Sequence, residues 1–428
     1  MTTVEHAENQ VADGAAAPKL VTADGVPLKS SLKRAERRKK LAAFFLVTPL
    51  LLFIIVTFIL PIASMLWRSV DNPALVTYLP NTVEAIETWD GDGLPDEAVY
   101  AAMVDDLIVG GENRTIGQVA VRLNYEMSGA RSLFSGSARR ADELEPPYKE
   151  ALIDLNPNWG EISTWRIIER EASPITASYY LAAVDMGYGE DGSVQFQDEN
   201  RRIYLPLFGR TLVLSISITL TTLALGFPIA YLLATLPMRY SNLLMIFVLL
   251  PFWTSLLVRT SAWIVLLQQQ GVINEILVSL GLLSDDNRVQ MVYNATGTVI
   301  AMTHILLPFM VLPLYSVMKT IPPSYMRAAC SLGAHPFLAY WRVYVPQTVP
   351  GIAAGAILVF IISIGYYITP ALVGGQSGQL ISNLIAHHMQ SSLNWGLAAA
   401  LGSILLAGVL ILYWLFNRLV GVEKLKFG

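Results

Sequence analysis

The chain has 428 residues, of which 54% are hydrophobic and only 14% charged, and its formal net charge at pH 7 is −4. Soluble globular proteins carry about 25% charged residues, and the apolar residues of this chain gather into long uninterrupted runs. The composition therefore excludes a soluble protein and indicates a membrane protein. The single cysteine, Cys330, excludes an intramolecular disulfide bond.

The N-terminal segment is polar. Residues 1–30 contain little apolar material, so we expect them to be disordered. A dense basic stretch follows within residues 33–40, formed by Lys33, Arg34, Arg37, Arg38, Lys39 and Lys40. Basic residues beside a membrane helix mark its cytoplasmic side, so residues 1–40 are predicted to form a disordered basic cytoplasmic tail. Nucleic-acid binding is a poor explanation for basic residues at this place, and no nucleic-acid partner is expected.

About 20 apolar residues suffice to cross a bilayer as a helix, and six segments meet this requirement. They are residues 41–66, 207–236, 243–267, 298–317, 348–373 and 397–416. The first, which ends by residue 68, is too long for a cleavable signal peptide and lacks a small-residue cleavage site. Backbone polar groups find no water inside a bilayer, so each span must be helical. The predicted fold class is an all-α membrane protein with six transmembrane helices.

Residues 69–205 form a long insert between the first two spans. They contain 24 acidic and 10 basic residues, whereas the rest of the chain contains 9 acidic and 19 basic residues. Because basic residues favour the cytoplasmic side, this acidic insert is predicted to lie outside the cytoplasm, in the periplasm. Its apolar stretches and aromatic residues, among them Trp89, Trp159 and Trp165, predict a folded and mostly helical domain.

Residues 206–428 are predicted to form the membrane core, and its basic residues agree with one orientation. Six spans return the C-terminus to the side of the N-terminus, and Arg418, Lys424 and Lys426 fit a cytoplasmic C-terminus. The loop between the fourth and fifth spans, residues 320–346, falls on the same side.

This loop reads MRAACSLGAHPFLAYWRVYVP over residues 326–346. We expect a short helix over 323–332 and a second helix over 336–345. Gly333 lies between them, where glycine permits the backbone angles of a corner between helices.

The spacing of the loop resembles the "EAA" cytoplasmic loop of permease subunits of ATP-binding cassette (ABC) importers. Two small residues, Ala328 and Ala329, are followed at the family's spacing by Gly333 and Pro346. Arg327 departs from the pattern, because the family usually has Glu there. The resemblance implies that these five residues couple the chain to an ATPase.

Three further stretches resemble the permeases of spermidine/putrescine-type ABC importers. They are LPFWTSLLVRT at 250–260, LLPFMVLPLY at 306–315 and TPALVGG at 369–375. The resemblance covers about half of the chain. It implies the type I ABC importer permease fold and a multi-pass protein of the bacterial inner membrane with both termini in the cytoplasm.

The resemblance also implies partners. These are two ATPase subunits, a second and non-identical permease subunit, a periplasmic substrate-binding protein and membrane lipid. No Gly-x-x-x-x-Gly-Lys-[Ser/Thr] phosphate-binding loop occurs in the 428 residues. We therefore expect a non-catalytic subunit without a cofactor of its own, with ATP and Mg²⁺ bound by the partner ATPase.

Polar and aromatic residues of the third and fifth spans are candidates for the substrate pathway: Trp253, Thr254, Ser255, Arg259, Tyr366, Tyr367 and Thr369. A polyamine such as spermidine or putrescine is the expected solute, because aromatic rings bind organic cations and the acidic insert attracts them. No Asp or Glu occurs in any predicted span, which leaves opines, amino-acid derivatives and other small solutes open.

Two other classes of function remain open. A channel or secondary transporter would leave the EAA-like loop without a purpose. A membrane enzyme or sensor would use the acidic insert to bind a ligand. No cluster of residues indicates a catalytic or metal site, because His387 and His388 are adjacent and cannot share one helix face.

Overall fold

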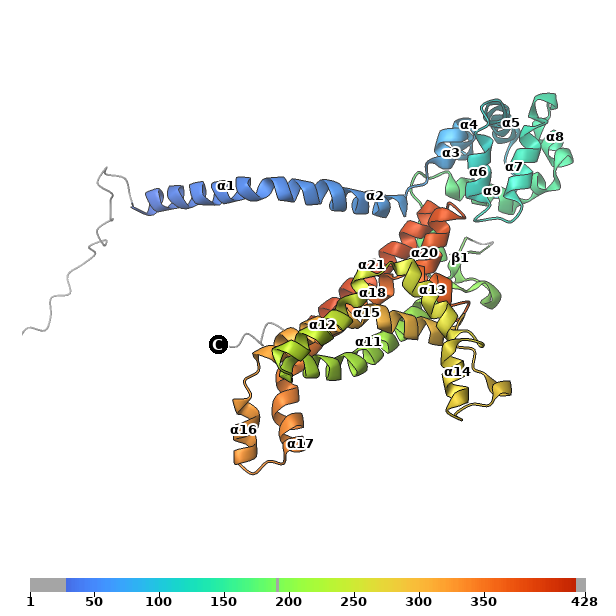
Figure 1. Ribbon diagram of the computed structural model, residues 1–428. Coiled ribbons are helices and arrows are strands. Elements are labelled where there is room, and N and C mark those ends of the chain that lie inside the picture. The colour runs from blue at the N-terminus through green and yellow to red at the C-terminus, as the bar shows by residue number, and fades with distance from the viewer. Residues whose placement is uncertain (1–27, 190–191, 421–428) are drawn as a thin grey trace, which may run out of the picture. The chain divides into compact units, whose positions relative to one another are not determined.

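The computed structural model describes residues 28–189 and 192–420 of the chain (Figure 1). The chain divides into two compact units, 1–65 and 66–428, which are taken separately. Most of the predicted N-terminal tail, residues 1–27, lies outside the described residues, as do Lys424 and Lys426.

The first unit is dominated by one long helix. It runs through α1 (Leu28–Ile54) and a π-helical turn, η1 (Ile55–Ile59), into α2 (Leu60–Arg68). The helix thus begins well before residue 40, where the predicted tail ends. Its segment Glu36–Arg68 is long and apolar enough to cross a membrane, in agreement with the first predicted span.

Helices dominate the insert, as the sequence predicts. They are α3 (Pro73–Tyr78), α4 (Pro80–Ile86), α5 (Glu97–Glu112), α6 (Ile116–Leu123), α7 (Ala130–Ala138), α8 (Tyr148–Leu155), α9 (Ile162–Glu171) and α10 (Ser178–Ala183). Short 3₁₀ turns lie at η2 (Ala141–Glu143), η3 (Pro157–Gly160) and η4 (Glu199–Arg201). A small antiparallel hairpin of β1 (Met186–Tyr188) and β2 (Val194–Phe196) was not predicted; it pairs Met186 with Phe196.

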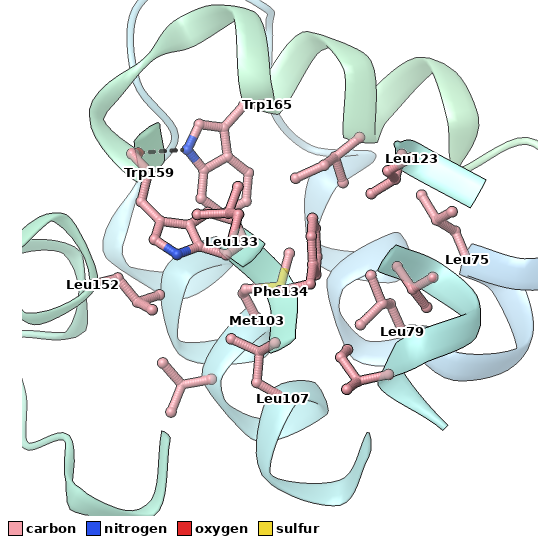
Figure 2. Packing of buried hydrophobic residues seen from close by; sticks show 14 of the residues in the cluster. Leu75, Leu79, Met103, Leu107, Leu123, Leu133, Phe134, Leu152, Trp159 and Trp165 are labelled. Atoms are coloured by element: carbon pink, nitrogen blue, oxygen red, sulfur yellow. Dashed lines mark hydrogen bonds between the residues drawn. The ribbon is translucent and has the colours of Figure 1, made fainter. Parts of the chain in front are cut away.

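The insert has a hydrophobic core of its own, formed by α3–α9. Figure 2 shows Trp159 and Trp165 beside one another in this core. The indole N–H of Trp165 donates to the backbone oxygen of Trp159 at 3.0 Å, and that of Trp159 donates to Ser137 Oγ at 2.9 Å. Large buried aromatic side chains with satisfied polar atoms stabilise a single packing arrangement. The insert is therefore a folded domain.

A network of buried charged and polar residues joins segments of the insert that are far apart in the sequence. Arg122 forms ion pairs with Glu171 and, at 3.0 Å, with Glu126, and Arg170 pairs with both carboxylates. Asn72 accepts from Arg122 Nε at 2.7 Å and donates to the backbone oxygen of Glu171 at 2.9 Å. Asn72 follows α2 and Glu171 ends α9, so this network holds the start of the insert against the end of α9.

The surroundings of Arg122 stabilise its positive charge. Burial works to lower the pKa of Arg122, but Tyr179 and the carboxylates of Glu171 and Glu126 outweigh it, and the pKa is raised above its ordinary value. The guanidinium lies over the Tyr179 ring, 4.8 Å from its centroid. A buried ion pair of this kind is costly to break by removing one partner.

The insert is joined to the membrane core by hydrogen bonds at helix ends. The buried carboxylate of Asp185 accepts from the backbone N–H groups of Ile203, Tyr204 and Leu205 at 2.9, 3.0 and 2.7 Å. These groups open α11 (Tyr204–Thr235), so Asp185 supplies the negative charge that a helix N-terminus favours. The insert thus continues directly into the second span.

The membrane core contains the remaining helices. After α11 come α12 (Met238–Trp253), α13 (Leu256–Leu267), α14 (Val272–Ser279), the 3₁₀ turn η5 (Asp285–Asn287), α15 (Ala295–Thr320), α16 (Ser324–Ser331), α17 (Pro336–Ala339), the π-helical η6 (Tyr340–Tyr344), α18 (Val345–Gly365), α19 (Ile368–Val373), α20 (Ile381–Gln390) and α21 (Trp395–Val420). In the described residues five helices could cross a membrane by length and composition, and one bent pair makes a sixth candidate.

That bent pair corrects the third predicted span, 243–267. It is not one helix: α12 and the segment Leu256–Ser279 meet at 101°. Thr254 and Ser255 have extended backbone angles, with ψ of 144° and 139°. Pro251 also lacks the N–H that an unbroken helix needs. An apolar run alone does not reveal such a break.

The fifth predicted span, 348–373, is also placed differently. The helix runs without interruption over Pro336–Gly365, so it takes in the second helix of the predicted loop. It ends at Gly365, and α19 is a separate short helix. The observed loop between these two spans is therefore shorter than the predicted range, 320–346.

The core is built around α15, which is the most buried span and packs against α11 and α18. Met310 of α15 packs against Gly226 of α11 and Gly355 of α18. A Cβ added at Gly355 would lie 2.7 Å from Met310 Sδ, and one added at Gly226 would lie 3.0 Å from Met310 Cγ. Small residues allow membrane helices to approach closely.

Replacing Gly355 with a larger residue should destabilise the core. We expect Gly355→Val to lower the free energy of unfolding by about 1–3 kcal/mol, because overpacking forces the helices apart. Thermal unfolding of the detergent-solubilised protein measures the effect. The matched control is Gly402→Val on α21, where an added Cβ meets nothing within 4 Å. Equal stability of the two variants would contradict the close packing.

Candidate coupling loop and substrate pathway

The coupling loop, residues 321–339, is a helical hairpin made by α16 and α17. Its corner is a Schellman turn: the N–H of Ala334 donates to Ala329 O at 3.1 Å and the N–H of Gly333 donates to Cys330 O at 3.0 Å. Gly333 has a φ of +90°, which side-chain-bearing residues rarely adopt. The predicted turn at Gly333 is confirmed, and His335 caps α17 by accepting from Phe337 N at 3.3 Å.

The predicted coupling residues occupy one accessible region, with one exception. Arg327, Ala328 and Gly333 are exposed and Ala329 is half-buried. Pro346 does not close the loop, as the sequence suggested; it lies in the first turn of α18, within the long continuous helix. The second helix of the loop, α17, is therefore the first turn of this long helix.

The loop and the adjoining turn of the helix expose large apolar side chains that sequence reasoning did not single out. Leu332 is 90% exposed, Phe337 69% and Trp341 54%. A cluster of exposed apolar residues beside exposed charges is typical of a protein–protein contact. These side chains of the loop are accessible to a partner.

The candidate pathway residues divide into two groups. Trp253, Thr254 and Ser255 lie at the break between α12 and α13 and are exposed. Trp253 forms no side-chain hydrogen bond within the described residues, whereas Thr254 donates to Pro251 O at 3.1 Å. These residues line the bend between the two helices.

The second group gathers around Arg259 on α13. Thr369 of α19 lies 3.3 Å from the hydroxyl of Thr260. Tyr366 packs in the same hydrophobic core as Leu256 of α13, and the Nε atom of Arg259 is buried without a hydrogen-bond partner in the described part of the chain. The structure therefore brings Tyr366 and Thr369 to α13, the helix that carries Arg259.

Sequence reasoning missed the contribution of α15 to this group. The indole N–H of Trp263 donates to His304 Nδ1 at 3.2 Å, which fixes the imidazole beside Arg259. The two residues are 41 positions apart and no sequence motif joins them.

Tyr367 lines a cavity beside α20. The side chain is exposed and borders this cavity of about 420 Å³ together with Asn383, His387 and Gln390 of α20. Amide and imidazole side chains can hydrogen-bond a polar solute there. Within the residues that the structure describes, no group of three or more His, Cys, Asp or Glu side chains could hold a metal ion.

Comparisons with known proteins agree with this architecture. The family described as "Binding-protein-dependent transport system inner membrane component" matches residues 202–421. The spermidine/putrescine transport system permease protein PotB of Escherichia coli K12 is 34% identical over 230 residues, which cover 52% of this chain and 83% of PotB. The inner membrane ABC transporter permease protein YdcU of the same strain is 34% identical over 205 residues, covering 45% of this chain and 64% of YdcU.

A solved bacterial ABC transporter involved in the import of the acidic polysaccharide alginate is 20% identical, with a TM-score of 0.42. That comparison covers 54% of this chain and 82% of the other. The family match begins at residue 202 and leaves the insert outside it.

Proposed function

The chain belongs to the family of binding-protein-dependent transport system inner membrane components, and we propose that it moves a polyamine such as spermidine or putrescine into the cell. It is a non-catalytic permease subunit of an ABC importer in the inner membrane. The observation that carries the proposal of ATP-driven import is the exposed helical hairpin at the end of a long membrane helix. A partner can move the membrane helices through such a hairpin only if it binds the hairpin.

We propose the partners that the family match implies for a permease subunit. Two ATPases bind ATP and Mg²⁺, and one of them holds the coupling loop through the exposed side chains of Leu332 and Phe337. A second, non-identical permease subunit completes the pathway, and a periplasmic binding protein delivers the solute. ATP-driven closure of the ATPases then rocks the spans between inward-open and outward-open states.

Arg327 is the departure from the family pattern. It is exposed on α16, so its guanidinium is free to meet an acidic residue on the ATPase in place of the usual Glu–basic pairing. Charge reversal on both sides of an interface preserves complementarity.

The number of crossings supports one orientation. When the bent pair of α12 and Leu256–Ser279 is counted as one span, the insert follows the first span and the coupling loop follows the fourth, so three spans separate them. On that count we place the insert and the loop on opposite sides of the membrane, with the loop and both termini in the cytoplasm and the acidic insert in the periplasm.

Two observations bear on the solute. The polyamine assignment is supported by similarity to PotB and by the acidic insert, which would concentrate cations near the entrance. A second candidate is a solute with a carboxylate, such as an opine or an amino-acid derivative. It is favoured by the buried and unpartnered Nε of Arg259, because a guanidinium N–H forms its strongest hydrogen bonds with an anionic acceptor.

The first prediction concerns coupling. In Gly333→Val the φ of +90° becomes strained by about 1–3 kcal/mol, so the hairpin opens and ATP-driven uptake should fall about tenfold or more. Uptake into vesicles that contain the whole importer measures the effect. Ala334→Val adds the same kind of side chain at the next position, where φ is not positive, and should retain uptake. Wild-type uptake by a normally inserted Gly333→Val protein would contradict the coupling role.

The second prediction concerns the solute. Vesicles that contain the whole importer with its binding protein should take up labelled spermidine or putrescine only when ATP is supplied. An excess of unlabelled polyamine should compete, and an excess of amino acid should not. Competition by carboxylate-bearing solutes alone would replace the polyamine assignment with the second candidate.

A further inference from the structure

Three tyrosines meet where the coupling loop joins the membrane core. Tyr231 comes from the last turns of α11, and Tyr340 and Tyr344 bound η6. The Tyr231 ring contacts those of Tyr340 and Tyr344 edge-on, with centroids 5.3 and 5.4 Å apart. The rings of Tyr340 and Tyr344 are stacked, 5.5 Å apart at an interplanar angle of 15°. We call these three residues the tyrosine joint.

The backbone at the joint departs from an α-helix. Val345 N–H donates to Tyr340 O, five residues back, which defines the π-helical turn. Pro346 has no N–H to continue the ladder. The side-chain amide of Gln347 donates to Val343 O at 2.7 Å. A π-helical turn inside a longer helix is a local irregularity that often lies at a functional site.

The joint also holds an unsatisfied polar group. The hydroxyl of Tyr344 is buried and has no hydrogen-bond partner among the residues that the structure describes. Its ring belongs to the hydrophobic core that includes Leu233 of α11 and Met318 of α15, and Met326 of α16 packs against the same core. A buried hydroxyl without a partner costs free energy, whereas a partnered one does not.

We propose that the tyrosine joint carries movement of the coupling loop into α11 and α18, and that the Tyr344 hydroxyl gains a hydrogen-bond partner in the other state of the transport cycle. The inference rests on the proposed function, since it requires an ATPase that moves the loop. Tyr231, Tyr340 and Tyr344 act as positioning residues and need not touch the solute.

The physical basis is a difference between two states. In the state described here the unpartnered Tyr344 hydroxyl raises the free energy of the protein. A state in which the hydroxyl finds an acceptor does not have this cost and is stabilised relative to the first state. A π-helical turn can shift along a helix with little change in hydrogen-bond number, which rotates the segment beyond it. Stacked and edge-on rings provide rigid contacts through which this rotation reaches α11.

The test removes the hydroxyl and keeps the ring. In vesicles containing the whole importer, Tyr344→Phe should be confined more often to the state described here. Solute moved per ATP hydrolysed should then fall about two- to tenfold, the effect of one hydrogen bond of about 0.5–1.5 kcal/mol. Tyr315→Phe is the matched control, because Tyr315 is a half-buried tyrosine of the same core outside the joint. It should leave the ratio unchanged.

A second variant tests the ring contacts. Tyr340→Leu removes the ring contacts of residue 340 with Tyr231 and Tyr344 and should lower the amount of solute moved per ATP while the complex still assembles; Tyr315→Leu should not. If the wild-type complex transports but Tyr344→Phe and Tyr315→Phe move the same amount of solute per ATP, the proposed role of the tyrosine joint is wrong and the proposed function stands. A wild-type complex without ATP-dependent uptake would overturn the proposed function, and the joint with it.

Discussion

The close approach of α15 to α11 and α18 is the contact on which the membrane core depends. Met310 occupies space that is available only because Gly226 and Gly355 carry no side chains. Lipid gives helices little reason to associate, so close packing between small and large residues must hold them together. Helix α15 also contributes to two further regions: Met318 packs in the core that includes Tyr344, and His304 accepts a hydrogen bond from Trp263 of α13.

The long helix Pro336–Gly365 connects these two regions. Its first turns carry exposed Phe337 and Trp341, and its last residue leads to Tyr366, which packs in the same core as Leu256 of α13. A rigid helix transmits displacement along its length, whereas a flexible loop would absorb it. The same element therefore links the proposed ATPase contact to the proposed substrate pathway. At the other end of the core, Asp185 links the insert to α11 in the same direct way.

Much of this architecture could be predicted from local sequence. Apolar length located the spans, and the glycine at 333 located the turn, because a φ of +90° requires that residue. The break at Thr254 and Ser255 and the continuity of α17 with α18 could not be predicted, since each lies within or beside an apolar run whose composition fits a straight helix as well. Contacts between distant residues were also hidden. Arg122 and Glu171 are 49 positions apart, and neither lies in a recognisable motif.

The most direct test of the account uses the chain's single cysteine, Cys330, which is exposed on α16. A photo-activated cross-linker attached to Cys330 in native membranes should join the chain to an ATP-binding protein, and Cys330→Ser should abolish the adduct. The account predicts that the ATPase is the main protein captured. Cross-links to lipid or to other membrane proteins, with no ATPase in the presence or absence of ATP, would contradict the coupling role of the loop.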